Sequence, residues 1–162
     1  MNKEDIQTFS YRISQANRTE LIVIMYDMAS AYIKQALDTY DNDFGQSDYS
    51  NSIVSAKRVV DRLMASLDMR YEISGELYRI YSIVQRYLIK AMAEPSEGSR
   101  RLLLSSDKML KRLRQSFYEV SLKDSSEPLM KNSQQIYAGF TYSNAGSSNE
   151  FSQDFNNRGF KV

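Results

Sequence analysis

The fold is decided by residues 17–40, NRTELIVIMYDMASAYIKQALDTY. Apolar residues recur there every three or four positions, which is typical of a helix that packs one side against other helices. Asn17 and Glu20 have the spacing of a capping box, in which each side chain bonds the free backbone N–H of the other residue. The sequence therefore predicts a helix from near Asn17 to about Tyr40.

Three further segments with helical periodicity follow this one. Turn-forming residues separate them, at DNDFGQS (residues 41–47) and EPSEG (residues 94–98). The second helix is predicted from a seam of apolar residues, the third over about residues 73–92 and the fourth over about residues 99–121. The seam consists of Ile53, Ala56, Val60, Leu63 and Leu67. Four helices joined by short loops predict an all-α protein, an antiparallel up-down four-helix bundle.

The composition changes after about residue 122. Ser, Asn, Gln and Gly dominate from there, with scattered Tyr and Phe, and such a segment cannot supply a core of its own. We therefore expect an N-terminal segment (1–16), a bundle (17–121) and a flexible or loosely docked C-terminal tail (122–162). Within that tail, residues 136–142 are predicted to dock on the bundle or to serve as a second partner motif.

Several classes of function are disfavoured by what the chain lacks. The 162 residues include no Cys, His or Trp, which excludes thiol nucleophiles, Cys/His zinc sites and imidazole catalysis. We expect no enzyme activity, no metal and no cofactor. A formal charge of +1 offers no field for nucleic acid. No apolar run reaches the roughly 20 residues of a membrane span, and the first residues lack a signal peptide, so a cytoplasmic protein without membrane insertion is expected.

The predicted helices differ in the width of their apolar faces. In the second helix the apolar residues fall within roughly 140°, whereas in the first they spread over roughly 240°, and the third resembles the first. A helix in a bundle hides an arc of only a little over ~100°. The first and third helices therefore carry apolar surface that a four-helix bundle does not obviously cover.

Three interpretations of this excess remain open at this stage: half-buried tyrosines, pairing with a second copy of the chain, or a groove for an amphipathic partner helix. The groove interpretation uses the flanks of both faces. Its predicted lining comprises Ile22, Tyr26, Ile33 and Leu37 from the first helix and Tyr78, Tyr81, Ile89 and Met92 from the third. Phe9 and Tyr11, which precede the predicted helices, are expected to cover part of this groove in the absence of a partner.

The fourth predicted helix carries a basic side opposite its apolar residues. No aromatic residue is interleaved among these cations, so we interpret them as a solvated face and not as a phosphate-binding surface. They are Arg100, Arg101, Lys108, Lys111, Arg112 and Arg114.

Short motifs carry a resemblance to a known family. TELIVIMYD (residues 19–27) follows a segment containing Tyr11, ASLD (65–68) ends the second helix, and GELYRIY (75–81) with RYL (86–88) lies in the third. In order and spacing these segments resemble signatures of the FliS family of flagellar export chaperones. Met25 replaces the more usual Leu, Ala65 precedes Ser66 without the common Asn two places before it, and Ser82 stands where Asp is frequent.

The resemblance implies a cytosolic chaperone without catalytic activity. Such a protein would hold the C-terminal segment of flagellin in helical form, prevent premature polymerisation and keep it competent for flagellar secretion. Tyr11 would belong to the partner-binding residues, and other flagellar export proteins are further candidate partners. The alternative is a structural, homo-oligomeric helical bundle, such as a homodimer, that binds no client.

Overall fold

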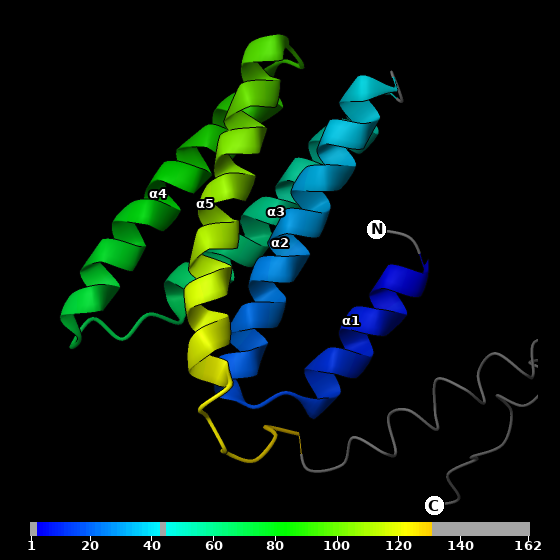
Figure 1. Ribbon diagram of the computed structural model, residues 1–162. Coiled ribbons are helices and arrows are strands. Elements are labelled where there is room, and N and C mark those ends of the chain that lie inside the picture. Colours follow the sequence, from blue (N-terminus) through cyan, green and yellow to red (C-terminus); the bar gives the residue numbers. More distant parts are fainter. Residues whose placement is uncertain (1–2, 43–44, 131–162) are drawn as a thin grey trace, which may run out of the picture. The chain divides into compact units, whose positions relative to one another are not determined.

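The computed structural model describes residues 3–42 and 45–130, which form five α-helices and, within these ranges, no strand (Figure 1). The helices are α1 (Lys3–Gln15), α2 (Arg18–Asp41), α3 (Gln46–Ala65), α4 (Glu72–Ala93) and α5 (Glu97–Ser121). The predicted all-α class is confirmed. The predicted docking of residues 136–142 lies outside the described residues, as does the tail from residue 131 onward.

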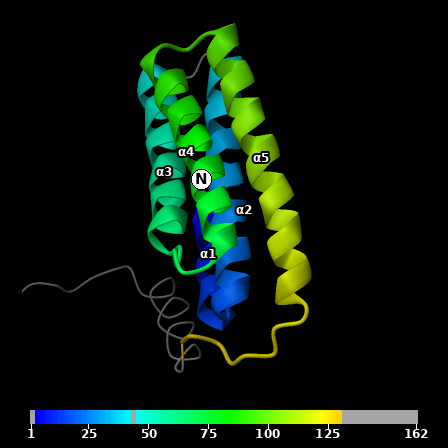
Figure 2. The same cartoon turned by 90° about the vertical axis from the view of Figure 1, so that its left-hand side faces the viewer.

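The four longer helices form a helical bundle in which each has two neighbours in a ring. Helix α2 contacts α3 and α5, and α4 contacts the same two helices from the opposite side (Figures 1 and 2). Helix α1 contacts α2 and no other helix of the described chain. The expectation of only four helices, with Phe9 and Tyr11 outside any helix, was therefore wrong, because both residues lie on α1.

Helix boundaries follow from local capping chemistry. The Asn17 side chain accepts a hydrogen bond from the Glu20 N–H at 2.9 Å, and Glu20 accepts one from the Asn17 N–H at 2.9 Å, so the predicted capping box is present. Ser96 caps α5 by accepting a hydrogen bond from the Ser99 N–H. Gly45 precedes α3 with φ +47, a value that glycine adopts without steric cost. The predicted ends of α2, α4 and α5 agree with the structure to within two residues.

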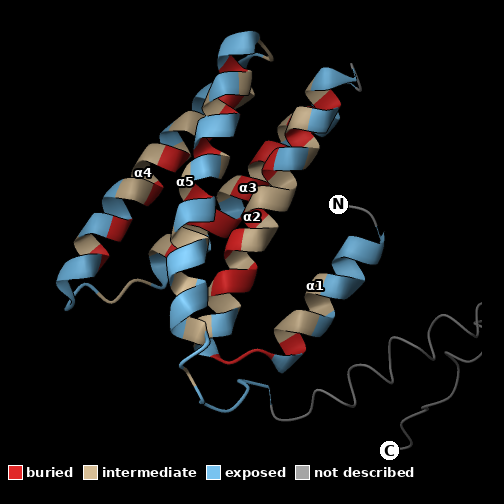
Figure 3. Cartoon of the chain, in the orientation of Figure 1, coloured by how far each residue is buried: buried red, intermediate tan, exposed pale blue. Residues whose placement is uncertain are grey.

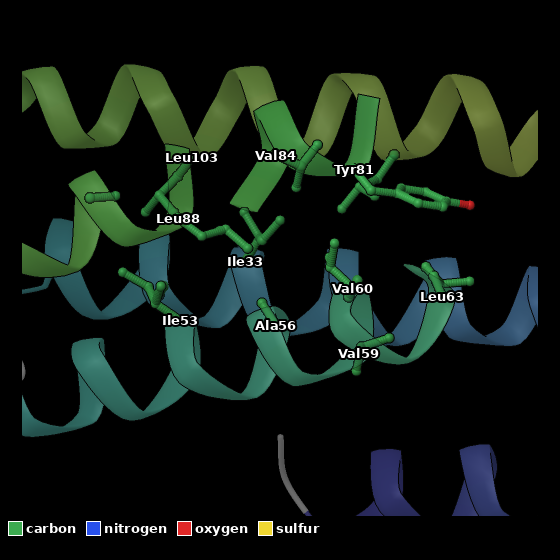
Figure 4. Packing of buried hydrophobic residues seen from close by; sticks show 14 of the residues in the cluster. Ile33, Ile53, Ala56, Val59, Val60, Leu63, Tyr81, Val84, Leu88 and Leu103 are labelled. Atoms are coloured by element: carbon green, nitrogen blue, oxygen red, sulfur yellow. The ribbon is translucent and has the colours of Figure 1, made fainter. Parts of the chain in front are cut away.

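The core lies inside the ring formed by α2, α3, α4 and α5. Branched aliphatic side chains from all four helices meet there, and Ile33, Val60, Val84 and Leu103 are completely buried (Figure 4). Full burial of such a side chain stabilises the folded state by about 1.5–3 kcal/mol. Packing of these side chains therefore holds the four long helices together.

Tyrosines in the core have polar partners. The hydroxyls of Tyr26 on α2 and Tyr81 on α4 are hydrogen-bonded to each other, and the Tyr49 hydroxyl donates to the Ala91 carbonyl at 3.0 Å. The Tyr26 ring also lies against Phe117, with 5.6 Å between ring centroids. Burial raises the pKa of the Tyr26 and Tyr81 hydroxyls, because an ionised phenolate would lose its hydration. The Tyr26–Tyr81 pair thus links two helices that are not neighbours in the ring.

Candidate functional site

A cleft of about 380 Å³ lies where α1, α2 and α5 meet. Tyr11, Arg12 and Gln15 line it from α1, and Val23 and Ile24 line it from α2. The other lining residues are Ala16, Glu20, Arg114, Tyr118, Ser121 and Leu122. The cleft therefore combines apolar side chains with two guanidinium groups and one carboxylate.

Val23 and Ile24 form an apolar strip on α2 that is separate from the central core. Each is only 4% exposed, yet neither belongs to the cluster of buried residues inside the four-helix ring. They line the cleft together with residues of α1. We infer that α1 keeps this strip from water, so that α2 is covered by three helices instead of two.

An ion-pair bridge connects α1, α2 and α5 beside this strip. The Asp27 carboxylate on α2 accepts from the Arg12 guanidinium of α1 at 2.6 Å and from the Arg114 guanidinium of α5 at 2.9 Å. The Arg114 guanidinium also lies over the Tyr118 ring, 5.0 Å from its centroid. The single Asp27 carboxylate thus forms ion pairs with two guanidinium groups and links α1 to both α2 and α5.

Helix α1 buries few of its own residues. Ser14 is its only buried residue, while Ile6 and Tyr11 are at least half exposed. In Figure 3 the buried colour appears on α1 only near its C-terminal end, where it continues into the link to α2. Elements with few buried apolar contacts open at low free-energy cost. Among the described helices, we therefore expect α1 to open most easily.

Three predicted groove residues belong to the core. Tyr26, Ile33 and Tyr81 are at most 1% exposed, so the expectation that they line an open groove is corrected. The physical reason is the ring arrangement. Helices α2 and α4 lie diagonally across the bundle, and their facing sides fill its interior. No single groove can therefore run between these two helices.

The other predicted residues remain at least partly accessible, on separate surfaces. Ile22 and Leu37 on α2 and Met92 on α4 are half-buried against the core. Tyr78 and Ile89 on α4 are 48% and 47% exposed, and Tyr11 lies on the cleft. Partner contact by these six residues stays a prediction.

Five large apolar side chains of α4 and of the turn before it are exposed. Met69, Tyr71 and Ile73 are each more than half exposed, in addition to Tyr78 and Ile89. The turn itself is well defined, because the Arg70 guanidinium bonds both oxygens of the Asp68 carboxylate and the Ser74 hydroxyl donates to the Asp68 carbonyl. We call Met69, Tyr71, Ile73, Tyr78 and Ile89 the α4 surface.

Sequence reasoning missed the cleft and its ion pairs. The basic residues of α5 were interpreted as a solvated face. Arg114 instead pairs with Asp27 and Arg100 with Asp41, whereas Arg101 and Lys111 pair with acids on their own helix. The spacing of Ile6, Phe9 and Ile13, which matches one face of a helix, was the available signal for α1.

A family model described as flagellar protein FliS matches residues 1–124 of this chain. Among curated proteins, no individual sequence is similar enough to count as a match. No helix of the described residues is long and apolar enough to cross a membrane. The FliS family consists of chaperones that bind flagellar proteins, and it is not an enzyme family. Since the match extends over three quarters of the sequence, this chain belongs to the FliS family of flagellar export chaperones.

Proposed function

We propose that this protein binds the C-terminal segment of flagellin in the cytoplasm, prevents its premature polymerisation and keeps it competent for secretion. The observation that carries the proposal is the α4 surface, five large apolar side chains that no other part of the described chain buries. Exposed apolar side chains that gather into a patch are typical of surfaces that bind a partner. Membership of a family that binds flagellar proteins favours a flagellar client.

In this proposal the four long helices act as an antiparallel four-helix scaffold (residues 17–121). Tyr78, Ile89 and Met92 contact the client from α4, and Ile22 and Leu37 provide a separate contact on α2. Residues 1–16 act as a removable cover, and residues 122–162 form the C-terminal tail.

The proposed binding step couples client folding to apolar burial. An unassembled client segment forms an amphipathic helix as its apolar side meets the chaperone, and it loses conformational entropy at that moment. Opening of α1 would add Val23 and Ile24 to the available surface and place Tyr11 at its edge. The light attachment of α1 supports this step, because few buried contacts are lost.

The test uses the full-length protein and a peptide of the flagellin C-terminal segment. Size-exclusion chromatography should give a one-to-one complex, and calorimetry at several temperatures should give a strongly negative heat-capacity change. A stable dimer that ignores the peptide would support the homodimer alternative and contradict the chaperone proposal.

Matched variants on α4 locate the contact. Tyr78→Asp and Ile89→Asp should each weaken peptide binding by at least about 2 kcal/mol, as loss of a buried anchor does. Lys90→Asp introduces the same carboxylate at an exposed neighbouring position and serves as the control. Equal binding by Tyr78→Asp and Lys90→Asp would show that the client does not use the α4 surface.

A further inference from the structure

The nine residues after α5 run back to the joint between α1 and α2. Residues 122–130, which we call the strap, lie mostly exposed and outside any helix. The Leu129 N–H donates a hydrogen bond to the Ala16 carbonyl at 3.0 Å. Ala16 follows the last residue of α1, so the strap is bonded to the point where α1 ends.

The strap also holds the start of α2. The Asn17 side-chain amide donates to the carbonyls of Asp124, at 3.2 Å, and Ser126, at 3.5 Å. The Thr19 hydroxyl donates to the Asp124 carboxylate, whose other oxygen accepts the Ser126 N–H at 3.0 Å. These bonds to Thr19 and Ser126 lower the pKa of the Asp124 carboxyl, which therefore stays ionised at neutral pH.

Asn17 joins the two sets of bonds. Its carbonyl oxygen caps α2 through the Glu20 N–H, while its amide nitrogen serves the strap, and the residue is only 4% exposed. A buried side chain with both ends occupied has one well-defined position. Asn17 therefore connects the strap to the first turn of α2 through hydrogen bonds.

Without the strap, the link between α1 and α2 would be a short hinge. Only Ala16 and Asn17 separate the two helices, and α1 contacts no helix of the described chain except α2. The ion pair between Arg12 and Asp27 also ties α1 to α2. The strap thus adds hydrogen bonds to both residues of this hinge, Ala16 and Asn17.

We propose that the strap is a latch that sets how readily α1 opens from the cleft. The latch consists of polar contacts at an exposed segment, so it releases without disruption of the core. This proposal rests on the proposed function in one respect only: that opening of α1 lets a client bind. The strap, near the C-terminal end of the described chain, would then control the opening of α1 at its N-terminal end.

Hydrogen–deuterium exchange of the free, full-length protein tests the latch. Leu129→Pro removes the N–H that bonds Ala16, whereas Leu129→Ala removes the same side chain and keeps that N–H. Amides of α1 should exchange about fivefold faster in Leu129→Pro than in Leu129→Ala, as loss of one typical hydrogen bond predicts. Amides of α4 should exchange equally in the two variants.

A second pair of variants tests the latch at α2. Thr19→Val removes the hydroxyl that bonds Asp124, and Thr19→Ser retains one. Faster α1 exchange in Thr19→Val than in Thr19→Ser supports the latch. Equal α1 exchange within both pairs overturns it. Because no client is present, a failure of flagellin binding would leave this result unchanged, and the two proposals can fail separately.

Discussion

Helices α2 and α4 carry similar apolar faces but meet different surroundings. Both pack against α3 and α5, and α2 has α1 as a third neighbour. On α2 the additional apolar residues Val23 and Ile24 are buried, whereas on α4 Tyr78 and Ile89 stay about half exposed. A wide apolar face therefore has two possible explanations: the helix has a third neighbour, as α2 does, or part of the face stays exposed, as on α4. Only the arrangement of the helices in the structure distinguishes the two.

The largest difference in stability is expected between substitutions of one isoleucine on α2 and one on α4. Ile33 on α2 is completely buried, so Ile33→Asp places a carboxylate in the core and should cost more than about 4 kcal/mol. Ile89→Asp on the exposed side of α4 should change the free energy of unfolding by less than about 1 kcal/mol. Urea denaturation followed by circular dichroism measures both. Similar midpoints for the two variants would contradict the assignment of Ile33 to the core.

The hydroxyl pair between α2 and α4 should give the next largest effect. Tyr81→Phe leaves the Tyr26 hydroxyl buried without its partner and should cost about 1–3 kcal/mol. Tyr78→Phe removes a hydroxyl from an exposed ring on the same helix and is the control. If the two substitutions have equal effects, the hydroxyl pair does not contribute to stability.

The same pair predicts a dependence of stability on pH. Unfolded tyrosine ionises near pH ~10, while burial raises the pKa of Tyr26 and Tyr81 above that value in the folded protein. Above pH ~10 the unfolded state therefore releases protons that the folded state retains, and the free energy of unfolding falls as pH rises. The double variant Tyr26→Phe/Tyr81→Phe should show a shallower fall. An identical slope would contradict the assigned origin of the effect.

A smaller effect on stability is expected from weakening the attachment of α1 to α2. Asp27→Asn weakens the bridge to Arg12 and Arg114, and because all three side chains are partly exposed it should cost less than about 1 kcal/mol. Opening of α1 should nevertheless increase, and with it the fluorescence of a hydrophobic dye that binds Val23 and Ile24. Asp38→Asn removes the same charge from an exposed position on α2. Equal dye signals would mean that Asp27 does not hold α1.

Much of the bundle could be predicted because its signals are local. The Asn17–Glu20 box and the breakers around Gly45 and Pro95 fix helix ends within a few residues of sequence, and local chemistry determines them. Helix α1 was not predicted from the sequence because it contributes little to the core, with Ser14 its only buried residue. Its periodicity was present in the sequence but too weak to be used.

The candidate site was harder to predict because it depends on contacts between distant residues. The width of a face shows how much of a helix is apolar but not which side meets which neighbour. Tyr26, Ile33 and Tyr81 were therefore assigned to a groove although they point into the core. The Asp27 bridge joins residues 15 and 87 positions apart in sequence, and no spacing rule reveals such pairs.

A gain in stability is predicted on α5, the helix that packs against both α2 and α4. Ser106 is completely buried there, and its hydroxyl has no hydrogen-bond partner among the described residues. Such a group costs about 1 kcal/mol or more, so Ser106→Ala should stabilise the protein. Ser105→Ala, at the exposed neighbouring position, gains only the higher helix propensity of alanine, about 0.5 kcal/mol. Thermal denaturation should therefore rank Ser106→Ala above Ser105→Ala, and the reverse order would show that a bound water satisfies the Ser106 hydroxyl between the helices.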